Sequence, residues 1–215
     1  MKSINTTEVQ QKEIDKQKGY SIIELSIALA IISLILVGSL AGVQRVLRSN
    51  NINKDLTAMN LLASRLTTIS SNMGTTAGTT MATLNSLNAF EGLNITAAAV
   101  AGADPTISNS FGGSFVVAPN TAAVGGYAAG GGFIVYSTGI PSAACPDLLL
   151  GLNNLSPQIT TDIGALVPAV IGATFANVAK AVGVNNIPAA TLIISCTPAV
   201  AQGGKVHIAA FIPKG

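Results

Sequence analysis

The sequence predicts an α+β protein in which a long N-terminal helix packs against an antiparallel β-sheet in a C-terminal head. Three observations predict this class. Residues Leu25–Gln44 form a run of twenty positions without a charge, helical periodicity continues beyond them to about Ser71, and short β-rich segments bounded by Gly or Pro follow. One long helix followed by several such strands is typical of an α+β architecture.

The predicted helix runs from about Tyr20 to about Ser71. Its first half is apolar all round, and about 20 residues at roughly 1.5 Å each are enough to cross the hydrocarbon core of a bilayer. Its second half is amphipathic, with apolar residues at steps of three and four, which are Ile52, Leu56, Met59, Ala63, Leu66, Ile69 and Met73. We expect the emergence into water to be marked by the charges of Arg45, Arg48, Lys54 and Asp55.

A carboxylate, Glu24, stands at the head of the apolar run. Because a charged side chain costs on the order of 2.5–3.5 kcal/mol at mid-bilayer and less near an interface, Glu24 is a candidate functional residue. The preceding segment, Met1–Gly19, contains four lysines and three acidic residues but no apolar run. It is therefore not a secretory signal peptide, whose apolar region precedes the cleavage point. Removal of this leader would leave the apolar helix at the new amino terminus.

The junction Lys18-Gly19-Tyr20-Ser21-Ile22-Ile23-Glu24 resembles the processing site of the type IV pilin family. That family has a Gly at the cleavage point, a hydrophobic or aromatic first mature residue and a Glu at the fifth mature position. Gly19, Tyr20 and Glu24 match these positions. The resemblance implies that a prepilin peptidase cleaves after Gly19 and N-methylates the amine of Tyr20, which leaves a mature chain of 196 residues.

Further features resemble the type IVb branch, in particular the toxin-coregulated and related colonisation pilins. The leader is long, the first mature residue is not Phe, and a large C-terminal region is closed by two cysteines. Gln44-Arg45, the strand-like Gly132–Ser137 ahead of Cys145, and the final apolar strand after Cys196 lie where that branch has such elements. The implied organisation is a cleaved leader (1–19), a hydrophobic helix that serves as membrane anchor and filament core (20–47), and a head (48–215). The head would combine the amphipathic half-helix, an αβ-loop and a disulfide-bounded C-terminal region.

The resemblance implies that Tyr20 and Glu24 act in the assembly of a pilus filament. The Glu24 carboxylate would pair with the methylated ammonium of Tyr20 from an adjacent subunit. Any other axial register of the neighbouring helices would leave a buried charge without its partner, which costs free energy. Alternatively, Glu24 reaches the lipid headgroups and marks topology alone. Gly38 and Gly42 are spaced so that helices could approach closely or melt locally, although glycine is also simply common in membrane helices.

The head is expected to contain several short elements. The αβ-loop, from Gly74 to about Ser110, would include a short helix at Met81–Phe90. The expected strands are Ser114–Ala118, Gly132–Ser137, Thr191–Ser195 and Lys205–Ile212. Two more helices are expected at Pro146–Leu152 and at Thr160–Val182, the second broken or kinked by Pro168.

Cys145 and Cys196 are the two cysteines of the chain. A head exported to an oxidising periplasm is expected to join them in a disulfide, which would stabilise the fold by roughly 4 kcal/mol in the chain-entropy model. The alternative is a pair of buried free thiols.

Composition excludes several other functions. Charged residues make up 9% of the chain and the formal net charge is +2, so the broad basic surface needed for non-specific nucleic-acid binding is absent from the sequence. The one histidine, His207, is expected at the surface because strand alternation places it opposite Val206 and Ile208. The sequence contains no Ser/His/Asp set and no metal-ligand spacing. We therefore predict a protein that is not an enzyme and uses no metal or cofactor.

The expected function is that of a major subunit of a type IVb pilus, which polymerises into a surface filament for adhesion, aggregation and colonisation. The resemblance implies other copies of the chain, a prepilin peptidase, an ATPase-driven inner-membrane platform, minor pilins and, before assembly, membrane lipid as partners. The precursor would reside in the inner membrane with its head in the periplasm, and the mature subunit in an extracellular filament. The alternatives are a minor pilin, a conjugative thin-pilus subunit, a type II secretion pseudopilin or, from a different class, a single-pass membrane-anchored periplasmic binding protein.

Overall fold

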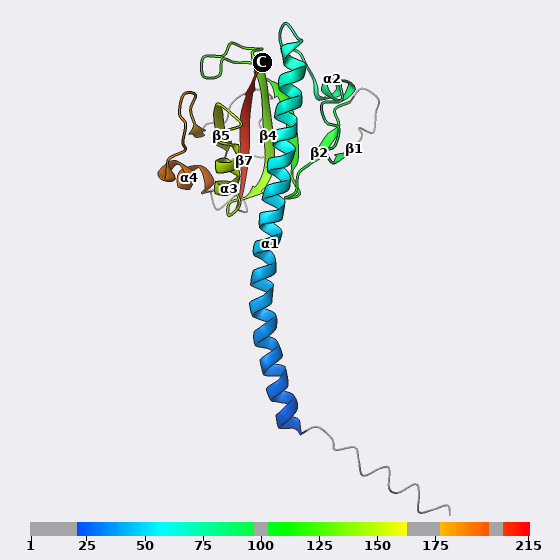
Figure 1. The fold of residues 1–215 in the computed structure, drawn as a ribbon, viewed down its shortest axis with the longest axis vertical. Coiled ribbons are helices and arrows are strands. Elements are labelled where there is room, and N and C mark those ends of the chain that lie inside the picture. Colours follow the sequence, from blue (N-terminus) through cyan, green and yellow to red (C-terminus); the bar gives the residue numbers. More distant parts are fainter. Residues whose placement is uncertain (1–20, 97–102, 163–176, 198–203) are drawn as a thin grey trace, which may run out of the picture. The chain divides into compact units, whose positions relative to one another are not determined.

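The computed structural model of the chain describes residues 21–96, 103–162, 177–197 and 204–215. It divides into two compact units, Met1–Leu47 and Arg48–Gly215. Helix α1 spans Ile22–Ser71 and contributes residues to both units (Figure 1). The predicted long helix is therefore confirmed over its described length, whereas its expected first residue, Tyr20, lies outside the described residues.

The second half of α1 is amphipathic, as predicted. Its inward face carries apolar side chains that recur at helical spacing and are at most 7% exposed, namely Ile52, Met59, Leu62, Ala63 and Leu66. These side chains belong to the main hydrophobic core together with residues of the sheet. Burial of this stripe holds the half-helix against the strands, since each fully buried large aliphatic side chain contributes about 1.5–3 kcal/mol.

The described residues of the second unit form a seven-stranded sheet in the order β1-β2-β3-β4-β7-β5-β6. Every pairing is antiparallel. The strands are β1 (Ile95–Thr96), β2 (Thr106–Ser108), β3 (Ser114–Pro119), β4 (Gly132–Pro141), β5 (Gln158–Asp162), β6 (Asn177–Lys180) and β7 (Lys205–Pro213). The three central strands β3, β4 and β7 coincide with predicted segments, whereas β1, β2, β5 and β6 were not predicted as strands.

Within the part of the head that the structure describes, three short helices accompany the sheet: α2 (Met81–Ser86), α3 (Cys145–Leu152) and α4 (Ala189–Cys196). Helix α2 lies within the segment predicted to be helical, and its first turn is capped by the Thr80 side chain, which accepts from the Thr83 N–H. Helix α3 is also as predicted, with Pro146 in its first turn, where the missing N–H costs nothing.

Two predicted elements are wrong. The segment Thr191–Ser195, expected as a strand, lies inside helix α4. A short apolar run does not by itself distinguish a buried strand from a short helix, and here Pro188 supplies the extended residue from which the helix begins.

The segment Thr160–Val182, expected as a helix, has strands at both described ends, in β5 and β6. Pairing of β5 with β7 and β6 satisfies its backbone hydrogen bonds on both sides and overrides the local helix propensity. The expected break at Pro168 lies outside the described residues.

The prediction that His207 lies at the surface is also wrong. It is 7% exposed, and its Nδ1 accepts a hydrogen bond of 3.2 Å from the Gly139 N–H. The reason is that β7 lies between β4 and β5 and is covered on both faces. The residues on the His207 face, Ala209 and Phe211, belong to a second apolar cluster, while Val206 and Ile208 belong to the main core.

Candidate functional site

Two of the predicted site residues, Gly19 and Tyr20, lie outside the described residues. Glu24 lies in the first turn of α1, where a carboxylate interacts favourably with the positive end of the helix dipole. Its side chain is exposed. Of the predicted Tyr20–Glu24 pair, the described residues include only Glu24, and its side chain is accessible.

The first half of α1 presents apolar side chains around its whole circumference. Ile22 is 86% exposed, Leu34 77% and Val37 73%. Among the described residues, α1 is the one helix that is long and apolar enough to cross a membrane. Because water is a poor solvent for so much apolar surface, this half-helix requires lipid or other helices around it.

The serine hydroxyls within the apolar half are satisfied internally. The hydroxyls of Ser26, Ser33 and Ser39 donate to backbone carbonyls three or four residues earlier, at 2.8, 2.7 and 3.0 Å. A hydroxyl bonded in this way carries little penalty in an apolar medium. The three serines are therefore compatible with a lipid or helix-bundle environment.

Gly38 and Gly42 lie in this half of α1 at open positions. A Cβ built on either glycine would meet no atom within 4 Å apart from its chain neighbours and the nearby backbone of its own helix. Packing within the chain therefore does not require glycine at these two positions, and any requirement must come from the surroundings of the helix.

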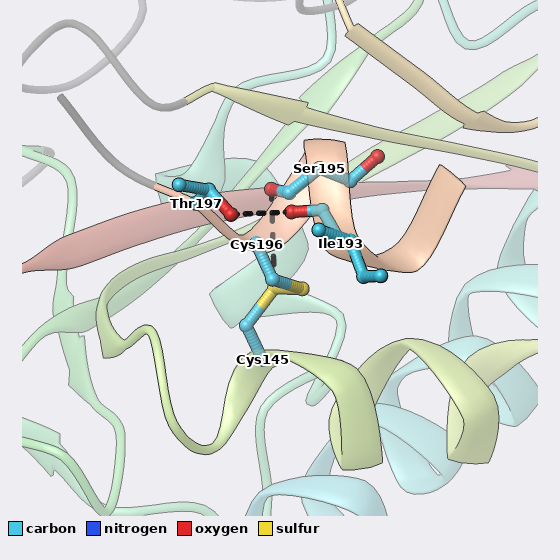
Figure 2. Close-up of a disulfide and its surroundings, with 5 residues drawn as sticks. All are labelled: Cys145, Ile193, Ser195, Cys196 and Thr197. Carbon is cyan, nitrogen blue, oxygen red and sulfur yellow. Dashed lines mark hydrogen bonds between the residues drawn. A yellow bond between two sulfur atoms is a disulfide. The ribbon is translucent and has the colours of Figure 1, made fainter. Parts of the chain in front are cut away.

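The disulfide is present between Cys145, at the start of α3, and Cys196, at the end of α4 (Figure 2). It joins residues 51 positions apart. Beside it, the Thr197 hydroxyl donates to the Ile193 carbonyl at 2.6 Å and closes the last turn of α4. The Ser195 carbonyl lies 4.0 Å from the Cys145 sulfur, a contact without a donor because a disulfide sulfur carries no hydrogen. The bond fixes the two helices of the C-terminal region to each other.

A buried carboxylate, Asp55, is a site that the sequence analysis missed. Asp55 was expected to mark the emergence into water, but it is 1% exposed. Its Oδ1 accepts a hydrogen bond of 2.8 Å from the Ser110 N–H, in the connection between β2 and β3. Burial raises the pKa of Asp55, and hydrogen bonding by Ser110 offsets part of that rise. Its position three residues after Ile52 and four before Met59 places it on the inward face of α1, which the helical periodicity could have revealed.

Comparisons with known proteins agree with this geometry. A family model described as the prokaryotic N-terminal methylation motif matches residues 14–40, and a model described as PilS N terminal matches residues 48–197. No curated protein has a significant match to the sequence.

Among solved structures, a type IVb pilin from Salmonella typhi superposes with a TM-score of 0.51 at 23% identity, over 74% of this chain and 97% of that one. TcpA, a type IV pilin from Vibrio cholerae El Tor, gives 0.49 at 18% identity, over 75% and 98%. The likeness to the Salmonella structure supports the fold.

The long N-terminal helix and the antiparallel sheet give this chain the fold of the type IVb pilin from Salmonella typhi, and the methylation motif matches its N-terminal region. The PilS model covers more than half of the chain, and the chain belongs to the PilS family. Pilins are structural subunits, so the prediction that this protein is not an enzyme is confirmed at the level of the family. Membership also favours homopolymerisation into pili, processing by a prepilin peptidase and a membrane-anchored precursor.

Proposed function

We propose that this protein is the major structural subunit of a type IVb pilus. A prepilin peptidase removes residues 1–19 and methylates the amine of Tyr20. An ATPase-driven inner-membrane platform, with minor pilins, then assembles the mature subunits into a surface filament for adhesion, aggregation and colonisation. Before assembly, residues 20–47 anchor the subunit in the inner membrane, with the head in the periplasm.

The observation that carries this proposal is the uncovered apolar surface of α1 from Ile22 to Leu47. In a precursor, lipid would cover this surface. In a filament, the equivalent helices of neighbouring subunits would replace the lipid, and the weakly charged head would face outward. With 9% charged residues and a net charge of +2, copies of the chain repel one another little at close approach.

Glu24 has a specific role in the proposal. Its carboxylate pairs with the methylated ammonium of Tyr20 on a neighbouring subunit, so that one axial register leaves no charge unpaired in the apolar core. Gly38 and Gly42 permit close helix contact or local melting in the same core.

The experiment compares filaments sheared from cells that produce the wild-type chain, Glu24→Ala or Glu91→Gln. Glu91 is an exposed carboxylate of the head that pairs with Arg65 at 3.5 Å and controls for loss of any one acidic group. We expect Glu24→Ala to yield processed subunits in the membrane fraction and few or no filaments, with Glu91→Gln close to wild type. Normal filament yield from Glu24→Ala would contradict the assembly role of Glu24.

A further inference from the structure

The strand pair β4–β7 contains a bulge at which two residues of β4 face one residue of β7. The register shifts between Ser137 and Ile140, so that Thr138 and Gly139 lie opposite His207 alone. Gly139 has a φ of +71°, which glycine adopts without strain. A bulge of this kind leaves a backbone group without its usual partner in the ladder of hydrogen bonds.

The side chain of His207 supplies a partner for the bulge. Its Nδ1 accepts a hydrogen bond of 3.2 Å from the Gly139 N–H, and the residue is 7% exposed. An imidazole nitrogen accepts a hydrogen bond only when it carries no proton, so this bond requires the neutral ring. Protonation of Nδ1 would set two N–H donors against each other, and the Gly139 N–H would lose its acceptor.

The carbonyl side of the same peptide group is held by the turn between β2 and β3. The Thr138 carbonyl accepts from Asn109 Nδ2 at 2.7 Å, and Asn109 Oδ1 accepts from the Gly113 N–H at 2.7 Å. The Thr138 hydroxyl also accepts from the Ser114 N–H at 2.9 Å. Because the Thr138 carbonyl and the Gly139 N–H belong to one planar peptide group, they rotate together. Loss of the bond to the histidine therefore releases the group that anchors Asn109.

Titratable side chains lie on the same face of the sheet as His207. Among the described residues these are Asp162, its pairing partner on β5, Tyr136 on β4, and Lys205, two residues earlier on β7. An ionised Asp162 favours a charged ring, Lys205 disfavours it, and a tyrosine stays neutral well above neutral pH. Solvent screens the two charges, because Asp162 is partly exposed and Lys205 is exposed. Burial of the ring and its bond to Gly139 both favour the neutral form.

We propose that the hydrogen bond from Gly139 to His207 is a pH-sensitive contact: the neutral ring holds the bulge of β4 and, through it, the turn between β2 and β3, and protonation of the ring releases both. Histidine side chains change charge between about pH 8 and about pH 5. Since the folded head requires the neutral ring, it binds fewer protons here than the unfolded chain, and its stability falls as pH falls through this range. The inference concerns the head alone and holds for a major or a minor subunit.

The test measures amide hydrogen exchange of the full chain in detergent at about pH 7.5 and about pH 5, expressed as protection relative to the intrinsic rate at each pH. Peptides that cover residues 109–114 and 137–141 report the turn and the bulge, and α3 serves as the control segment. We expect protection of the turn and the bulge to fall about tenfold at the lower pH, while α3 changes by less than about twofold.

Two substitutions of the histidine separate its charge from its size. His207→Asn places Oδ1 where Nδ1 lies, so that it accepts from Gly139 but takes up no proton. We expect it to retain protection of the turn at both pH values. His207→Leu has no acceptor and should show low protection at both. Asp162→Asn removes the carboxylate that favours the charged ring and should shift the loss of protection to lower pH.

A second titrating carboxylate touches this turn. Asp55 accepts from the Ser110 N–H, and burial raises its pKa. It is present in both the wild-type chain and His207→Asn, so the difference between these two chains reports the histidine alone. Loss of protection at the lower pH that persists in His207→Asn would overturn the proposal, as would equal protection at both pH values in the wild-type chain.

A final measurement needs no substitution, because the chain contains one histidine. The nitrogen chemical shifts of its imidazole report which nitrogen carries the proton. We expect a neutral ring protonated on Nε2 at about pH 7.5 and a charged ring once protection of the turn is lost. A ring that is charged at about pH 7.5, or protonated on Nδ1, would overturn the proposal.

Discussion

The Ser110 N–H donates to Oδ1 of Asp55 at 2.8 Å, and this bond ties the second half of α1 to the connection between β2 and β3. It gives one oxygen of a buried carboxylate a partner and leaves the other without one among the described residues. The charged form of Asp55 therefore lowers the unfolding free energy of the isolated subunit. This lowering depends on pH and can be measured.

Burial raises the pKa of Asp55 above its ordinary value of 3.8. The folded subunit thus keeps this proton at pH values where the unfolded chain has released it, and the folded state loses relative stability as pH rises from about 3.8 through the folded pKa. We predict that the stability of Asp55→Asn relative to wild type increases as pH rises from about 4 towards neutral pH. Unfolding of both processed chains in detergent across this range measures the difference, and a difference that does not change with pH would contradict it.

Gly113 is predicted to be intolerant of any side chain. A Cβ at this position would lie 1.9 Å from the Thr138 carbonyl oxygen, in a turn where the Asn109 side chain already bonds to Thr138 and Gly113. Gly113→Ala should cost about 3 kcal/mol of unfolding free energy, because backbone must move to relieve the overlap. The control is Gly74→Ala, whose Cβ meets no atom within 4 Å. Equal melting temperatures for the two variants would show that the turn differs from the one described.

Lys180 is predicted to stabilise the end of α3. Its ammonium is buried and donates to the Asn153 and Ser156 carbonyls, where a helix C-terminus favours a cation. Lys180→Met keeps the aliphatic stem but leaves both carbonyls without this donor, and we expect a loss of about 2–3 kcal/mol. Thermal unfolding measures it, with Lys205→Met as an exposed control. An unchanged melting temperature in Lys180→Met would mean that water replaces the ammonium.

The disulfide should account for a large part of head stability. Replacing both Cys145 and Cys196 with serine is expected to cost about 2–5 kcal/mol of unfolding free energy, and reduction of the wild-type chain should lower the unfolding free energy by a similar amount. Alkylation of the unreduced, denatured wild-type chain followed by mass measurement provides the direct check. Two labelled thiols would contradict the bond between α3 and α4.

Gly38 is predicted to matter in the filament and not in the subunit. Since a Cβ at this position meets no atom within 4 Å apart from its chain neighbours and the nearby backbone of its own helix, Gly38→Leu should leave the melting temperature of the head unchanged. In a filament core with closely packed or locally melted helices, the added side chain should lower filament yield. Val37→Leu, at a neighbouring exposed apolar position, is the size control. Wild-type yield from Gly38→Leu would remove the proposed role of this glycine.

The parts of the fold that could be predicted are those with a long or unambiguous periodic signal. Helix α1 has such a signal over its whole length, and β4 and β7 are rich in β-branched and aromatic residues. The run Thr191–Ser195 was too short for its period to separate strand from helix. The described part of Thr160–Val182 became two strands because the edge of β7 was free to pair, a long-range effect that local propensity does not contain.

The candidate functional residues also divide into those with a local sequence signal and those whose surroundings depend on tertiary structure. The processing motif at Gly19, Tyr20 and Glu24 is local and could be read directly. His207 was misplaced because alternation assumes one open face, whereas the loop between β3 and β4 brings Val124 and Tyr127 over the second face of the sheet. The Asn120 side chain holds that loop by donating to Ala128 and accepting from Gly132. Such coverage depends on tertiary structure.

The most direct test of the central claim is the intact mass and N-terminal sequence of the chain sheared from the surface of producing cells. The account predicts that this fraction is dominated by a chain of 196 residues that begins with N-methylated Tyr20. A processed chain confined to the membrane fraction would contradict the role of major subunit. A chain that still begins at Met1 would contradict processing and leave a membrane-anchored protein that does not polymerise.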